Sequence, residues 1–222
     1  MPLRHVLALQ MTTLLAWSPV PARPSALGIV VEAERAHVNT TAVTAGTTIY
    51  NGDRYSTETR GALLLRAGTT MLELAEASAI SLRNLANGAQ SIGVELDQGT
   101  LLFGAARSAD LEIVAREARV RPSAEGRTVA QISLMGPKEL GIYAQRGGLL
   151  FSYRGETETI AQGESYRVIL DPAEGDAKKG TIKAARERKT FLLVAIVGGS
   201  VGAAVGIYEN RGHRHKESPD RP

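Results

Sequence analysis

Cysteine is absent from the 222-residue sequence, which excludes disulfides, thiolate zinc sites and cysteine nucleophiles. Aromatic residues make up only 5% of the chain, so a core has to be built from leucine, isoleucine, valine and alanine, which the 43% hydrophobic content allows. Proline interrupts residues 27–170 only at Pro122 and Pro137. Paired strands need their backbone N–H groups, so this scarcity favours β-structure.

Groups that carry catalysis or bind metals are also scarce. His37 is the only histidine between residues 27 and 170, and a lone histidine among polar residues is more often a surface side chain than a base or a ligand. His213 and His215 have no further ligands near them in the sequence. Ser91 does not have the glycine spacing of a nucleophile elbow. The sequence therefore predicts no catalytic residue, no metal site and no cofactor, and a hydrolase is the least supported function.

The middle of the chain has no surplus of positive charge. Residues 27–170 contain 14 Lys and Arg against 16 Asp and Glu, a balance of 14 − 16 = −2. Residues 171–222 contain 10 basic and 7 acidic residues, a balance of +3. Proteins that bind nucleic acids concentrate cations on their folded domain, so the sequence predicts no nucleic-acid partner.

Glycine, in contrast, is plentiful, with 23 residues in the whole chain, and the glycines between residues 46 and 163 often lie seven to eleven positions apart. Short strands between such turns are typical of an all-β sandwich, barrel or solenoid. Several of the intervening segments alternate between apolar residues and carboxylates, which predicts one buried face and carboxylates in water. The carboxylates in these segments are Glu73, Glu95 and Glu112.

The N-terminal residues 1–26 have the pattern of a secretory signal peptide. Arg4 and His5 precede a modestly apolar run over residues 6–17, and small residues follow at positions 20–22. The alternative is an ordinary N-terminal tail or the first element of the core.

The C-terminal segment FLLVAIVGGSVGAAVGIY, residues 191–208, has 18 residues without a charge. A bilayer core of about 30 Å needs roughly 17 to 25 helical residues, so a transmembrane helix is predicted, with a buried core helix as the alternative. Gly198, Gly202 and Gly206 would share one face of this helix and let two helices approach closely. The alternative is that glycine is simply common in membrane helices.

Residues 171–190 are polar and are predicted to form a linker, and residues 209–222 a disordered tail. The linker carries basic residues that we expect to flank the membrane, although the positive-inside rule alone would place the preceding domain in the cytoplasm. A signal peptide would place it outside, and we expect this orientation because long domains translocate largely regardless of charge. The basic residues are Lys178, Lys179, Lys183, Arg186, Arg188 and Lys189.

The stretch 44–82 resembles the periplasmic domain of the FecR family. The resemblance rests on a glycine-aspartate turn followed by a threonine, a second glycine and apolar strands, namely Gly52, Asp53, Thr57 and Gly61. Later matches lie at residues 99–103, 143–151 and 162–164. The resemblance implies a compact multi-stranded β-solenoid or sandwich-like domain over residues 27–170, located in the periplasm. FecR-type regulators resemble three-part proteins with a cytoplasmic anti-sigma segment before the membrane helix, whereas here the expected helix follows the domain.

These features together predict a single-pass protein of the bacterial inner membrane with its β-domain in the periplasm. We expect an interaction or signalling domain that binds rather than catalyses, with the membrane, another envelope protein or a second copy through the helix as partners. The alternative function is a structural envelope component that binds glycan or peptidoglycan.

Overall fold

The computed structural model describes residues 25–85, 91–107, 110–123, 126–172, 185–187 and 190–196. These residues form seventeen β-strands connected in one curled sheet, and none of them lies in an α-helix. The all-β prediction is therefore confirmed for this part of the chain. The strands are β1 (Ala26–Val38), β2 (Thr41–Ala42), β3 (Thr48–Tyr50), β4 (Arg54–Ala67), β5 (Thr70–Leu74), β6 (Ala79–Asn84), β7 (Ile92–Gln98), β8 (Thr100–Ala105), β9 (Leu111–Ala115), β10 (Ala118–Pro122), β11 (Thr128–Gly136), β12 (Glu139–Arg146), β13 (Leu149–Tyr153), β14 (Glu156–Ile160), β15 (Ser165–Leu170), β16 (Ala185–Glu187) and β17 (Phe191–Ala195).

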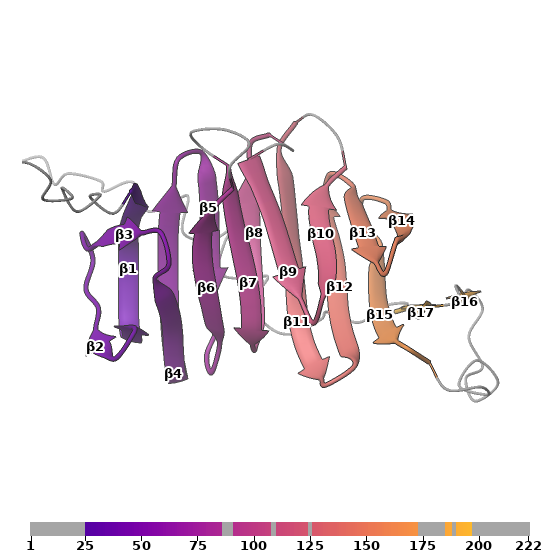
Figure 1. The fold of residues 1–222 in the computed structure, drawn as a ribbon, viewed down its shortest axis with the longest axis horizontal. Coiled ribbons are helices and arrows are strands. Elements are labelled where there is room, and N and C mark those ends of the chain that lie inside the picture. Colours follow the sequence, from indigo (N-terminus) through magenta and orange to yellow (C-terminus); the bar gives the residue numbers. More distant parts are fainter. Residues whose placement is uncertain are drawn as a thin grey trace, which may run out of the picture.

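The sheet divides at the long strand β4. The first part of β4 pairs with β6, and its second part pairs with β5. One branch continues from β6 through β7, β9, β10, β13 and β14, and the other continues from β5 through β8, β11, β12, β15 and β17. Both branches extend along the long axis of the molecule, and in the view of Figure 1 the branch that begins with β6 lies in front of the branch that begins with β5. We call them the front layer and the back layer.

The core fills the space between the layers. Strands β5 and β10 alternate between buried and more exposed positions, as expected for strands with one face in the core. Leu72 and Phe103 of the back layer and Ile80 and Ile113 of the front layer are all essentially inaccessible to solvent. Each such side chain contributes about 1.5–3 kcal/mol through its removal from water. The aliphatic core expected from the low aromatic content is therefore present.

The layers meet again at the end of the molecule away from β1. Phe151 of β13 and Phe191 of β17 pack edge to face, with ring centroids 4.9 Å apart and ring planes at 74°. Thr190 donates a hydrogen bond to Glu156 at 2.9 Å, and Tyr153 donates one to Asp171 at 3.1 Å. These contacts join the last strands of the two layers.

The transmembrane helix expected over residues 191–208 does not begin at Phe191, because residues 191–195 form strand β17. This strand pairs with β15, and Phe191, Leu192 and Leu193 are buried. A continuous apolar run suits a strand covered on both faces as well as it suits a helix, and periodicity alone does not separate the two. Within the expected linker over 171–190, residues 185–187 form strand β16, which pairs with β17, and Asp171 and Thr190 form hydrogen bonds with Tyr153 and Glu156.

Other predicted segments lie outside the described residues. They comprise residues 1–24 of the expected signal peptide, the glycines Gly198, Gly202 and Gly206, the tail 209–222, and the basic residues Lys178, Lys179, Lys183, Arg188 and Lys189. Arg186 falls in β16. In the part of the chain that the structure describes, no helix has the length and apolar character needed to cross a bilayer.

Candidate binding surfaces

The glycine-aspartate turn of the predicted motif connects β3 to β4. Gly52 has a φ of 91°, which favours glycine, and its N–H donates to the carbonyl of Leu82 at 2.9 Å. The Asp53 carboxylate accepts hydrogen bonds from the Tyr50 N–H at 2.8 Å and the Tyr55 hydroxyl at 3.3 Å. Burial raises the pKa of the Tyr55 phenol, and the charge of Asp53 raises it further. This part of the motif holds the start of β4 against β6.

Thr57 and Gly61 of the same motif mark the place where β4 passes between the layers. The Thr57 hydroxyl donates to the Ala75 carbonyl at 2.5 Å and accepts the Ser78 N–H at 3.0 Å. A side chain on Gly61 would lie 2.7 Å from the carbonyl oxygen of Arg35, so the crossing leaves no room for one. All four motif residues therefore serve the fold.

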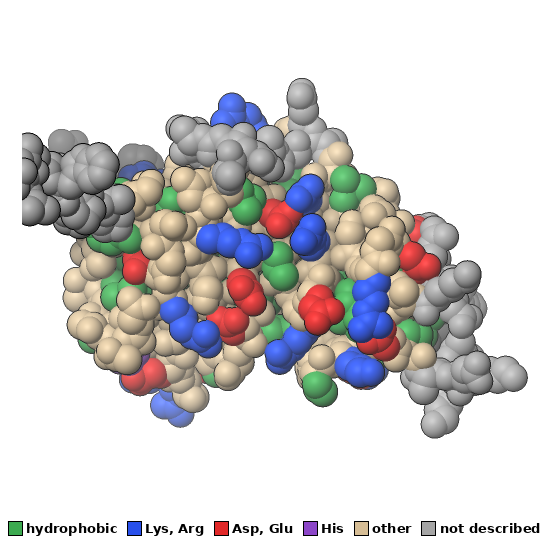
Figure 2. Space-filling view, viewed as in Figure 1, with side chains coloured by type: hydrophobic (Ala, Val, Ile, Leu, Met, Phe, Trp, Pro, Cys, Tyr) green, Lys and Arg blue, Asp and Glu red, His purple; other side chains and the backbone are tan. Residues whose placement is uncertain are grey.

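The outward side of the front layer carries alternating charges, which Figure 2 shows as interleaved blue and red side chains. The Arg54 guanidinium lies 3.1 Å from the Asp97 carboxylate, which also accepts a hydrogen bond from Ser81 at 3.2 Å. Arg119 of β10 and Glu95 of β7 are exposed on either side of Val114 of β9. We call this surface the charged face, and it consists of Arg54, Ser81, Arg83, Glu95, Asp97, Glu112, Arg119 and Arg121.

Glu112 is the centre of the charged face. Its carboxylate forms an ion pair with Arg121 of the next strand and lies 3.8 Å from the Arg83 guanidinium. The Glu112 side chain is only 8% exposed, whereas the side chains of Arg83 and Arg121 are about half exposed, at 48% and 54%. The expectation that alternation places Glu112 in water is wrong, because arginines from two other strands cover it. The carboxylate holds both guanidiniums in place on an otherwise open surface.

The outward side of the back layer has fewer charges, and its ion pair between Arg167 and Glu139 lies beside a row of uncharged residues. Directly paired residues form a row across it, with Leu102 opposite Gln131, Gln131 opposite Tyr143, and Tyr143 opposite Ser165. We call this surface the uncharged face, and it consists of Met71, Leu102, Val129, Gln131, Ser133, Tyr143 and Ser165.

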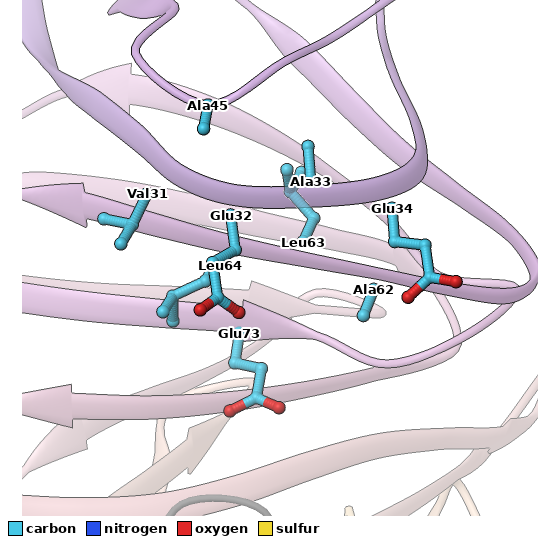
Figure 3. A pocket seen from close by; sticks show the side chains of 9 residues that line it. All are labelled: Val31, Glu32, Ala33, Glu34, Ala45, Ala62, Leu63, Leu64 and Glu73. Carbon is cyan, nitrogen blue, oxygen red and sulfur yellow. The ribbon is translucent and has the colours of Figure 1, made fainter. Parts of the chain in front are cut away.

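An acidic hollow lies at the end of this row, where β1, β4 and β5 meet. Its volume is about 340 Å³, and the carboxylates of Glu32 and Glu73 flank Leu64 on the same side of the sheet, with Glu34 farther along β1 (Figure 3). The described residues that line the hollow include three glutamates and no lysine or arginine. Sequence patterns gave no signal for this site, because Glu73 reaches Glu32 only through the pairing of three strands.

Among the described residues, neither face carries a group of side chains that indicates catalysis. No group of three or more His, Asp or Glu side chains is placed to hold a metal ion among the described residues. His37 Nε2 lies 3.6 Å from Glu58 Oε1, and their side chains are 32% and 58% exposed. This is a surface pair at the edge of β1 and not an enclosed site.

Comparisons with known proteins give a distant likeness in fold. No family model and no curated protein matches the chain. Crystal structures of a putative anti-sigma factor from Parabacteroides distasonis ATCC 8503, at 1.65 and 2.50 Å resolution, align with 12% sequence identity and a TM-score of 0.44. Each alignment covers 52% of this chain and 54% of that chain, so it spans about half the length of each protein.

Proposed function

We propose that this chain is a non-catalytic binding module in envelope signalling, and that the charged face is the surface that recognises a protein partner. The observation that carries this proposal is the arrangement around Glu112. A nearly buried carboxylate fixes two half-exposed guanidiniums on the outward side of the sheet, so their outward N–H groups are already oriented for a partner. Such fixed guanidiniums lose less conformational entropy on binding than free side chains do.

The pattern of charge favours a protein over a polyanion. Arg54, Arg119 and Arg121 alternate with Glu95, Asp97 and Glu112, so the surface presents both signs within a few strands. Nucleic acids require a predominantly positive surface. A partner with alternating carboxylates and basic groups would match this surface, and charge complementarity of this kind gives specificity and faster association.

A charge reversal tests the charged face. Arg119 is exposed and forms no ion pair with another described residue, so Arg119→Glu changes the surface with little effect on folding. We expect a partner captured from envelope extract by the wild type to bind the variant about tenfold more weakly, which corresponds to about 1.4 kcal/mol. Arg66→Glu, which changes an exposed arginine on the opposite layer, is the matched control. Equal loss in both variants would contradict the assignment, and retention on purified cell wall alone would favour the structural alternative.

We further propose that the domain is exported by residues 1–26 and displayed in the periplasm at the inner membrane. This proposal rests on the sequence pattern and on the FecR resemblance. The cysteine-free chain allows a clean test with Thr159→Cys, since Thr159 is exposed on β14. A membrane-impermeant maleimide should label this variant in intact spheroplasts. Labelling only after the membrane is broken would contradict a periplasmic location.

Membrane anchoring by residues 191–208 requires β17 to leave the sheet. Residues 196–208 alone number thirteen, and a helix of that length is about 20 Å long, against about 30 Å for a bilayer core. Anchoring and the paired strand are therefore alternative states of one segment. In the anchored state, helix association through Gly198, Gly202 and Gly206 is tested by replacing them with isoleucine, which should reduce self-association in a membrane assay. Unchanged association would remove that part of the proposal.

A further inference from the structure

Arg83 of β6 reaches a carboxylate that lies two strands away. Strand pairing places Arg83 opposite Gly93 of β7, and Gly93 opposite Glu112 of β9, so the three residues form one row across the charged face. Two strand spacings of ~4.8 Å separate the backbones of β6 and β9. The Arg83 guanidinium still lies 3.8 Å from the Glu112 carboxylate. The Arg83 side chain therefore crosses the outward side of β7 to reach it.

The path across β7 exists because position 93 has no side chain. A Cβ atom at Gly93 would lie 2.7 Å from both Cγ and Nε of Arg83 and 3.0 Å from Cδ2 of Leu85. These separations are shorter than ordinary van der Waals contacts, so the Arg83 stem occupies the space that a side chain would need. The φ of Gly93 lies outside the left-handed region, so the backbone itself does not require glycine here. The close approach of Arg83 accounts for a glycine inside this strand.

Arg121 approaches the same carboxylate from the other side. Its Nε donates to Glu112 Oε2 at 2.7 Å and its Nη2 bonds the same oxygen, while Arg83 lies nearest to Oε1. The donors Nη1 of Arg121 and Nε and Nη1 of Arg83 bond no other described residue. We call Arg83 and Arg121 the arginine pair. Two guanidiniums and one carboxylate leave this cluster with a net charge of 2 − 1 = +1.

The surroundings of the arginine pair match a carboxylate on an apolar stem. A guanidinium presents its N–H groups in a planar fork that fits the two oxygens of a carboxylate. One negative charge balances the cluster, whereas a phosphate group carries ~1.5–2 negative charges at neutral pH. A phosphate would also face the exposed carboxylate of Glu95, two residues after Gly93 on the same side of β7. Leu150 lies opposite Arg121 on the next strand and is only partly buried, so it offers an apolar contact to the methylene groups of a glutamate.

We propose that the arginine pair binds the side-chain carboxylate of a glutamate in the protein partner. Gly93 is the positioning residue, because it lets Arg83 cross β7 and share Glu112 with Arg121. This inference rests on the proposed role of the charged face and names the chemical group that the face recognises. A side chain at position 93 would displace Arg83 and leave Arg121 alone on Glu112.

Titration of the full-length protein with a defined peptide tests the ligand. The probe is acetyl-Ser-Gly-Glu-Gly-Ser-amide, and the matched peptide has glutamine in place of glutamate. Binding is followed through the arginine Nε–H signals in the nuclear magnetic resonance spectrum of isotope-labelled protein. We expect the signals of Arg83 and Arg121 to shift, while that of Arg167 on the back layer stays in place. The glutamate peptide should bind about tenfold more tightly than the glutamine peptide, as expected for two partly exposed charge-assisted contacts.

A glycine-to-alanine substitution tests the positioning role. Gly93→Ala should weaken binding of the glutamate peptide about threefold, because the added Cβ displaces Arg83 and one of the two contacts is lost. Arg83→Ala should weaken binding by the same factor, and the double variant should bind no more weakly, since both changes remove the same contact. Gly136→Ala is the matched control, because a Cβ there would meet only the Glu139 Cβ at an ordinary 3.8 Å. This control should bind the peptide like the wild type.

Each part of the proposal can fail separately. Equal affinity for the two peptides would overturn the carboxylate as ligand, and equal affinity for acetate would overturn the choice of a protein side chain. Wild-type affinity in folded Gly93→Ala, or additive losses in the double variant, would overturn the positioning role. If Gly93→Ala unfolds the protein, adding Arg83→Ala should restore folding, and failure to do so would have the same meaning. The Arg119→Glu experiment uses no peptide, so partner loss there without peptide binding here would reject the arginine pair and retain the charged face.

Discussion

The outward sides of the two layers are both formed by β-strands, but their side chains differ in charge and in exposure to solvent. On the front layer, charged side chains alternate along β6, β7, β9 and β10, and even Glu112, which is nearly buried, is compensated by arginines. On the back layer, Leu102 and Gln131 occupy equivalent outward positions without any charge and are excluded from solvent. A sheet face open to water needs polar side chains, whereas an apolar face needs a cover. This difference is the reason for placing the proposed partner surface on the front layer.

The largest effect is expected at Phe191, where the back layer is joined to the front. Phe191→Ala removes a fully buried ring that packs on Phe151, and such substitutions cost about 3–5 kcal/mol. Chemical denaturation monitored by circular dichroism would measure this loss in the free energy of unfolding. A loss below about 1 kcal/mol would mean that β17 is dispensable for the domain, and the back layer would then end at β15.

A matched pair of leucines compares the two faces directly. Leu102→Ala on the uncharged face should cost about 2–4 kcal/mol, because the side chain is almost fully buried. Leu150→Ala lies on the outward side of the front layer, where the side chain is only partly buried, and should cost about 1 kcal/mol or less. Denaturation midpoints of the two variants give the comparison. Equal losses would remove the distinction between a covered and an open face.

A matched pair of glutamates then separates structural from free charge on the charged face. Glu112→Gln leaves Arg121 and Arg83 without their common anion, and a cost of about 1–2 kcal/mol is expected, which is moderate because both arginines are half exposed. Glu95→Gln, at an exposed position, should stay within about 0.5 kcal/mol of the wild type. The same denaturation assay measures both variants. An unchanged free energy of unfolding in Glu112→Gln would mean that the carboxylate does not organise the charged face.

The smallest effect is expected from alkaline pH and concerns the two ends of the front layer. Burial raises the pKa of Tyr55 and of Tyr153, with Asp53 and Asp171 as neighbouring carboxylates that raise it further. Unfolded tyrosine ionises near pH ~10, so the unfolded chain loses these protons first and the stabilisation, complete below that pH, falls as pH rises above it. Stability measured against pH should decline above about 10. Replacing both tyrosines with phenylalanine should flatten this decline, and an unchanged slope would assign it to other groups.

The fold class was predictable because its signals are local. Glycine spacing and the alternation around Glu73 and Glu95 indicate strands within single segments, and the structure confirms them as β5 and β7. The fate of Glu112 was not predictable, since its arginines come from other strands and only the pairing brings them near. The acidic hollow was not predictable either, because Glu32 and Glu73 come near each other only through the pairing of β1, β4 and β5. Residues 191–195 form strand β17 where the sequence predicted the start of a helix, because an apolar run fits a helix and a doubly covered strand equally well.

The contrast between the faces can be measured most directly with two serine-to-cysteine variants, since the chain has no other thiol. Ser133 lies on the uncharged face at 8% exposure, and Ser152 lies on the outward side of the front layer, where it is more exposed. The rate of reaction with a soluble disulfide reagent reports the accessibility of each introduced thiol in the native protein. We predict that Ser152→Cys reacts at least tenfold faster than Ser133→Cys, which corresponds to about 1.4 kcal/mol in protection. Equal rates in folded proteins would contradict the claim that one face is open and the other is covered.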